Sequence, residues 1–222
     1  MRRHLESPAT ALSTSRVMNA RTAAILLATV STASIASAQE RVEISPFFGY
    51  QVGGGVTSFP GRLDVDADTS YGVFVDLRVR PDATIQLLYD RQDTVLSFRS
   101  SDPFSPTQVS AGLSIEYFHF GGTVEFSEES LRPYFALTVG ATRFDPAPAE
   151  FGDEWRFSIG FGGGVKTFLS NRVGLRLDGR VWPTFLNTRG GFFCSLPGGC
   201  LVSIEADLVY QANATVGFFF VF

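Results

Sequence analysis

The sequence has little of what nucleic-acid binders and helical membrane proteins use. Its 222 residues include a single lysine, Lys166, and two histidines, and the formal net charge is −4. A chain this acidic and this poor in lysine is disfavoured as a nucleic-acid binder. The only long apolar run without charge lies near the N-terminus, at about residues 22–38, which argues against a bundle of membrane-spanning helices. The 45% hydrophobic content, with 22 Phe, excludes a disordered chain.

The N-terminal apolar run has the features of an export signal. Arg21 precedes it, and Ala36-Ser37-Ala38 supplies the small-x-small pattern at which signal peptidase cleaves. We therefore predict a signal peptide over residues 1–38 and a mature domain over residues 39–222. Met18 offers an alternative start, because the residues before it make the leader unusually long.

The mature sequence alternates with a period of two and lacks the 3.6-residue period of amphipathic helices. Counting back from Phe222, one parity is apolar as far as Ile204, while the other is mostly polar or small. This stretch is far longer than the usual strand of a soluble sheet. The same alternation predicts seven further strands, at residues 42–52, 71–80, 83–90, 112–126, 135–142, 155–166 and 173–182. In segment 112–126, Ile115 and Tyr117 break the parity of Phe118 and Phe120, and a β-bulge near Tyr117 would reconcile the two.

The predicted connections alternate between short and long. Short ones fall near residues 81–82, 127–132 and 170–171, and longer ones span about 53–69, 98–110, 145–153 and 187–201. This alternation is typical of bacterial outer-membrane barrels, which have tight periplasmic turns and longer external loops. The sequence therefore predicts a closed eight-stranded antiparallel up-and-down transmembrane barrel, with both termini in the periplasm.

The parity pattern alone also fits a soluble lipocalin-like cup with its apolar side chains pointing inward. Two features favour lipid. Gly160, Gly162 and Gly164 would be exposed on such a cup without purpose, whereas pointing inward they leave room for arginines of the neighbouring strand. The second feature is the aromatic C-terminus. Aromatic residues at the strand ends suit two interfacial girdles, namely Trp155, Tyr71, Tyr134 and Phe218 to Phe222.

Three segments resemble the small outer-membrane β-barrel domains of Gram-negative bacteria, the OmpA-like, OmpX-like and opacity-type barrels. They are Val216-Gly-Phe-Phe-Phe-Val-Phe222, His119-Phe-Gly-Gly-Thr-Val-Glu-Phe126 and Arg132-Pro-Tyr-Phe-Ala-Leu-Thr-Val-Gly-Ala141. The resemblance implies that Phe218, Phe220 and Phe222 form the assembly signal read by the barrel-assembly machinery. It implies outer-membrane lipids and lipopolysaccharide as partners. It does not specify an activity, because these barrels serve many roles.

The inward parity carries equal numbers of acidic and basic side chains. They are Glu43, Asp76, Asp90, Asp178, Glu205 and Asp207, with Arg78, Arg80, Arg156, Lys166, Arg176 and Arg180. An eight-stranded barrel is just wide enough for its side chains to fill it, and unpaired charges there are costly. We therefore expect a salt-bridged, non-conducting lumen, with a narrow solute path as the alternative. Closure of the last hairpin is expected to bring Arg180 close to Asp207.

Two other candidate sites are weaker. Asp64-Val-Asp-Ala-Asp68 looks like the start of a calcium loop, but Thr69 and Val75 stand where the EF-hand pattern needs Gly and Glu. We expect a solvated acidic loop, with weak divalent-ion binding near lipopolysaccharide as the alternative. Cys194 and Cys200 enter an oxidising compartment, so the expectation is a disulfide.

His119 is the only histidine left after cleavage. It lies between Phe118 and Phe120 with no H-x-S motif, so the sequence shows no nucleophilic Ser–His pair. We predict a structural histidine, no metal or cofactor, and no enzyme activity. The expected function is a structural or surface-interaction role through the external loops, as a monomer. The alternatives are a narrow or lateral transport barrel for small or hydrophobic solutes and, less favoured, a lipid-modifying barrel enzyme.

Overall fold

The computed structural model describes residues 42–58, 61–100, 108–126, 130–147, 152–186, 191–195, 199–203 and 208–222. For residues 56–58, 61, 108–109, 191–195 and 199–203 it describes the backbone alone. The predicted signal peptide and its cleavage site lie outside these ranges and stay a prediction. Among the described residues, none forms a helix long and apolar enough to cross a membrane.

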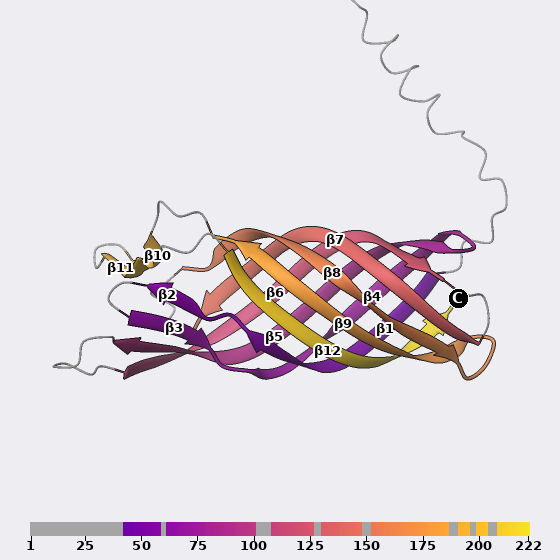
Figure 1. Cartoon of the computed structure of the whole chain (residues 1–222), viewed down its shortest axis with the longest axis horizontal. Coiled ribbons are helices and arrows are strands. Elements are labelled where there is room, and N and C mark those ends of the chain that lie inside the picture. The colour runs from indigo at the N-terminus through magenta and orange to yellow at the C-terminus, as the bar shows by residue number, and fades with distance from the viewer. Residues whose placement is uncertain are drawn as a thin grey trace, which may run out of the picture. The chain divides into compact units, whose positions relative to one another are not determined.

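Eight long antiparallel strands close into a barrel (Figure 1). They are β1 (Val42–Gly53), β4 (Asp68–Arg80), β5 (Ala83–Ser100), β6 (Gln108–Glu125), β7 (Leu131–Pro146), β8 (Glu154–Phe168), β9 (Val173–Phe185) and β12 (Leu208–Val221). Each strand pairs with its neighbours in sequence, and β1 pairs with β12 from Glu43 opposite Val221 to Gly53 opposite Gln211. The predicted fold class, an eight-stranded antiparallel meander without a free edge, is confirmed.

Both described chain ends of the barrel lie beside the short turns. The amide of Phe222 donates a hydrogen bond to the carbonyl of Val42 at 2.9 Å, and the short connections after β4 and β8 lie at the same end. We call this the turn end of the barrel. The opposite end, from which the longer connections leave, is called the loop end.

Two short hairpins lie within the longer connections. β2 (Val56–Ser58) and β3 (Gly61–Val65) form the first, and β10 (Gly191–Ser195) and β11 (Gly199–Ser203) form the second as a separate two-stranded sheet. β3 pairs with the last residues of β5, beyond the point at which β4 pairs with it. β5 therefore continues ten residues past its predicted end at residue 90, because β3 and β6 supply backbone partners where the apolar alternation fades.

The bulge predicted in β6 is wrong. β6 pairs residue by residue with both β5 and β7, without a register shift. Ile115 and Tyr117 are fully buried and point into the barrel, whereas Phe118 and Phe120 face outward and are 42% and 60% exposed. The polarity of the inward residues changes along the strand, while the backbone register does not.

The outward side chains form an apolar band around the barrel. Phe48, Leu87, Phe120, Leu137 and Leu177 each have about half or more of their surface exposed. The inward side of the same strands carries the buried charges and amides. A soluble sheet protein has the reverse arrangement, so this barrel is built to stand in lipid, where closure leaves no unpaired edge.

Candidate functional site

A row of glycines on β8 makes room for large side chains inside the barrel. A Cβ on Gly162 would lie 2.9 Å from Cγ of Arg180, so this glycine accommodates an arginine of β9, as predicted. A Cβ on Gly160 would lie 2.3 Å from Cζ3 of Trp182. Gly160 therefore makes room for an indole ring and not for the expected arginine.

Buried charges form a network that we call the ionic layer. Its members are at most 5% exposed and are Glu43, Asp76, Glu125, Lys166, Arg176, Asp178 and Arg180. Lys166 Nζ lies 2.7 Å from Glu43 and 3.4 Å from Glu125, and Arg176 lies 2.6 Å from Asp76. Each charge has a partner of opposite sign, which is the condition for burying it. The layer fills the lumen toward the turn end.

Aromatic rings and an amide complete the ionic layer. The Arg176 guanidinium lies 3.9 Å from the ring centre of Phe74, and Arg180 donates to Gln86 Oε1 at 2.6 Å. The hydroxyl of Tyr134 donates to Asp178 and accepts from Arg176 Nε. Tyr134 is therefore a lumen residue, and its predicted place in the girdle is wrong. Phe219 is likewise fully buried.

Not every predicted lumen charge joins the ionic layer. Arg78 is partly exposed and reaches Glu125 at 3.1 Å from the rim. Arg80 points to water and pairs with Asp82 at 3.4 Å, so its placement in the network is wrong. Arg156 pairs with Glu154 near the loop end and lies apart from the layer.

Asp90 is fully buried, and no ion pair to it occurs among the described residues. Its Oδ2 accepts a hydrogen bond from Asn213 at 2.7 Å. Asn213 is also the residue of β12 that lies opposite Arg180 in the register, and the proximity of Arg180 to Asp207 stays a prediction. The positions of Glu205 and Asp207 themselves lie outside the described residues.

Sequence reasoning missed Glu125, which contacts three cations. Besides Lys166 it lies 3.1 Å from Arg78 and 3.6 Å from Arg132. The signal was available, because Glu125 has the same parity as His119 in β6.

A second level of the lumen, toward the loop end, is filled by apolar side chains. We call it the apolar layer, formed by Leu63, Leu96, Leu113, Ile115, Tyr117, Phe144, Trp182, Leu186 and Val209, all at most 6% exposed. The rings of Tyr117 and Trp182 stack with their centres 4.8 Å apart. The lumen is thus occupied by protein at two successive heights.

His119 does meet a serine, contrary to the sequence expectation. Its Nε2 lies 2.8 Å from Ser158 Oγ, and its Nδ1 lies 3.3 Å from the hydroxyl of Thr138. The pair was invisible in sequence because β7 separates the two strands that carry it. His119 is 4% exposed and Ser158 is fully buried, and the ring faces a hydroxyl where a catalytic triad has a carboxylate.

The acidic segment makes local polar contacts. Asp64 pairs with Arg62 at 2.6 Å, and Asp68 accepts a hydrogen bond from the amide of Thr69 at 2.6 Å. No group of three or more His, Cys, Asp or Glu side chains positioned for a metal occurs in the described part of the chain. The backbone of β10 and β11 sets Cys194 opposite Cys200. Their side chains lie outside the described set, so the disulfide stays a prediction.

Charged residues replace apolar ones on the outer wall near the loop end. We call this group the outer belt, formed by Arg91, Asp93, Glu116, Arg143, Asp145 and Asp153. Arg91 and Arg143 both contact Glu116, at 3.2 and 2.9 Å. The hydrogen bond from Arg143, 2.9 Å to Asp153, lowers the pKa of that carboxyl group.

Girdle aromatics are attached to the outer belt. Tyr89 donates to Glu116 at 2.8 Å, and the indole of Trp155 donates to Asp153 at 3.1 Å. Aromatic residues of this kind lie at the headgroup level of membranes. The belt therefore marks the height at which the apolar band ends.

This geometry, a closed eight-stranded barrel with an apolar outer band and a lumen filled by side chains, is the fold of small outer-membrane barrels. No family model and no curated relative matches the sequence. The fold is similar to that of Neisserial surface protein A (NspA), with 13% identity, a TM-score of 0.53, and 82% of this chain and 97% of that chain covered.

Two further solved structures show the same likeness. Outer membrane protein OprG of Pseudomonas aeruginosa has 12% identity and a TM-score of 0.53, covering 82% of this chain and 96% of that one. Outer membrane protein AlkL has 17% identity and a TM-score of 0.52, covering 82% and 90%. At such identities the likeness establishes the fold and leaves activity open.

Proposed function

We propose that this chain is an integral protein of the bacterial outer membrane that acts as a non-conducting scaffold for surface interactions at its loop end. Its wall supplies the apolar band that lipid requires. At its loop end the β2–β3 hairpin pairs with β5, which has 18 residues where about ten suffice to span a membrane. The β10–β11 hairpin lies in the long connection between β9 and β12.

The observation that supports the proposal is that buried side chains occupy the lumen at two heights. A solute crossing the barrel meets the ionic layer at one height and the apolar layer at another. Lys166, Arg176 and Trp182 are at most 1% exposed. Opening a path requires breaking buried ion pairs, each of which is costly to separate.

Planar-bilayer recording of the purified, refolded protein tests the closed lumen. We expect no stable single-channel openings from the wild-type barrel. A variant that shortens three plug side chains at once, Lys166→Ala, Arg176→Ala and Trp182→Ala, is expected to conduct if it folds. Stable openings of the wild-type protein would contradict the proposal.

Orientation and partners follow from the same proposal. Short turns face the periplasm in outer-membrane barrels, so both barrel termini would be periplasmic and the loop end external. The outer belt then lies at the level of lipopolysaccharide headgroups. Phe218 and Phe220 face outward on β12, and Phe222, which follows the strand, is also exposed, so the assembly machinery could read all three during insertion. The barrel is proposed to act as a monomer.

A transport role is the second candidate, and the apolar layer favours it. Leu63, Leu96 and Leu113 make the loop end of the lumen apolar, a suitable lining for a hydrophobic solute that leaves sideways through the wall. Uptake of a small alkane by vesicles that contain the barrel tests this. Uptake equal to that of empty vesicles would exclude the route.

Catalysis is the least supported role. Ser158 and His119 are in contact, but both are enclosed within the lumen, away from lipid and bulk water. We propose that they pack the interior together with Thr142, which donates to Ser158 at 2.8 Å. Mass spectrometry of lipid A from cells that produce wild-type protein or Ser158→Ala should show the same species. A difference between them would establish an enzyme.

A further inference from the structure

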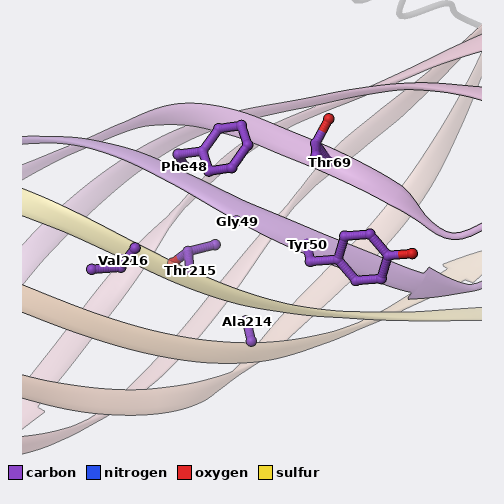
Figure 2. Close-up of a pocket in the computed structure, with 7 residues that line it drawn as sticks. All are labelled: Phe48, Gly49, Tyr50, Thr69, Ala214, Thr215 and Val216. Atoms are coloured by element: carbon purple, nitrogen blue, oxygen red, sulfur yellow. The ribbon is translucent and has the colours of Figure 1, made fainter.

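An apolar groove lies on the outer wall, over the seam where β1 and β12 close the barrel (Figure 2). It is shallow and open along the wall, with a volume of about 370 Å³. It is lined by Phe48, Gly49, Tyr50, Thr69, Ala214, Thr215 and Val216. This feature plays no part in closing the lumen and is not explained by the scaffold role.

The groove arises because small residues interrupt the outward row of large ones on β12. Ala214 stands opposite Tyr50 in the register, and the neighbouring outward position is also an alanine, Ala212. Phe48 and Tyr50 are 56% and 53% exposed and rise from β1 beside this low stretch. The result is a floor of methyl groups and backbone next to aromatic walls.

The two ends of the groove differ in polarity. Tyr50 and Thr69 place hydroxyl groups at the end of the lining nearer the loop end (Figure 2). The Tyr50 hydroxyl donates to the carbonyl of Ala67 and the Thr69 hydroxyl to Asp68 Oδ1, each at 3.3 Å, so both oxygens can still accept a hydrogen bond. The bond from Tyr50 fixes the ring that forms one wall. Toward the turn end the lining is Phe48 and Val216, without a polar side-chain atom. The occupant should therefore be apolar along its length and polar where it reaches the loop end.

We propose that this groove holds one acyl chain of an outer-leaflet glycolipid of the lipid A type, with its polar linkage at the hydroxyls of Tyr50 and Thr69. The inference rests on the proposed outer-membrane location, which makes the loop end external and the surrounding leaflet the lipopolysaccharide leaflet. Phe48, Tyr50, Ala214 and Val216 have the outward parity, which places their side chains among acyl tails and not against water. An unbranched chain fits the recess over Ala214, whereas the strand of a second copy would bring its own side chains against Phe48 and Tyr50.

Native mass spectrometry of the refolded barrel in detergent, with added lipid A or phosphatidylethanolamine, tests the proposal. Wild-type protein should retain one lipid A in preference to phosphatidylethanolamine. Ala214→Leu fills the floor and should lower lipid A retention roughly tenfold or more, because the lost apolar contact is the main attraction. Ala141→Leu is the matched control, since Ala141 is an outward alanine of β7 remote from the lining. It should retain lipid A as the wild type does.

Equal retention by Ala214→Leu and wild type would overturn the groove proposal, as would equal retention of the two lipids. A dimer that Ala214→Leu abolishes would assign the groove to a second copy instead. Folding of each variant is checked by its heat-dependent migration in gel electrophoresis and by insertion into phosphatidylethanolamine vesicles. Failure of the wild type to insert would refute the membrane barrel itself, a result distinct from loss of lipid retention alone.

Discussion

Single residues inside the barrel carry charges that only their neighbours make tolerable. Lys166 is the chain's one lysine, and it lies within 4 Å of three carboxylates, those of Glu43, Asp76 and Glu125. Removing one partner from a buried ionic cluster leaves uncompensated charge, which costs far more than losing an exposed pair. Residues of equal charge should therefore differ sharply in their effect on stability.

Lys166→Met should lower the free energy of unfolding by about 3–5 kcal/mol, since methionine keeps most of the volume and removes the charge. Arg62→Gln is the control, because its side chain is 63% exposed and paired only with Asp64, and it should cost about 1 kcal/mol or less. Urea unfolding in lipid vesicles measures both. Equal costs for the two variants would mean that the ionic layer does not support the fold.

Gly160→Val should destabilise the barrel by about 1–3 kcal/mol through overpacking against Trp182. The same change at Gly152, which has open space around its Cβ position, should stay within about 0.5 kcal/mol. In a Trp182→Ala background the cost of Gly160→Val should shrink, because the clashing ring is gone. An undiminished cost, measured by the same urea titration, would place the strain elsewhere.

At the scale of strands, the sequence could predict the barrel because the outward residues of the apolar band all meet the same apolar surroundings. All eight long strands follow from that alternation. The predictions that failed concern the interior, whose polarity depends on height. A rule that every inward residue is polar would place Ile115, Tyr117 and Tyr134 on the outer surface, whereas all three are buried inside the barrel.

The alternation also does not indicate at what height along the barrel a residue lies, or which residue of a distant strand it contacts. Arg80 has the inward parity but lies at the end of β4, where the lumen opens to water. The contact of His119 with Ser158 spans a whole intervening strand. The register of β9 with β12 depends on the connection between them, so parity alone could not predict that Arg180 lies opposite Asn213.

The β10–β11 hairpin should be dispensable for the barrel and required for any surface interaction that it carries. It forms a sheet of its own without backbone pairing to the barrel strands. Replacing residues 191–203 by a short Gly-Ser linker should leave heat-dependent gel migration unchanged and reduce binding to lipopolysaccharide or cell surfaces. Loss of the folded form would show that the hairpin belongs to the barrel instead.

At the scale of the whole molecule, the account depends on which way the side chains of the wall point. The chain has two tryptophans, and the structure places them on opposite sides of that wall. Trp155 is 51% exposed on the outer surface, and Trp182 is fully buried in the lumen. Their fluorescence can therefore report separately on the lumen and on the outer surface of the barrel.

Fluorescence quenching by lipids with brominated acyl chains tests the central claim most directly. The Trp182→Phe variant, which retains Trp155, should lose much of its emission in brominated vesicles. The Trp155→Phe variant, which retains Trp182, should emit nearly as in unbrominated lipid. Quenching of Trp182 with Trp155 unaffected, or recovery of both variants as water-soluble monomers, would contradict a barrel whose apolar side faces the membrane.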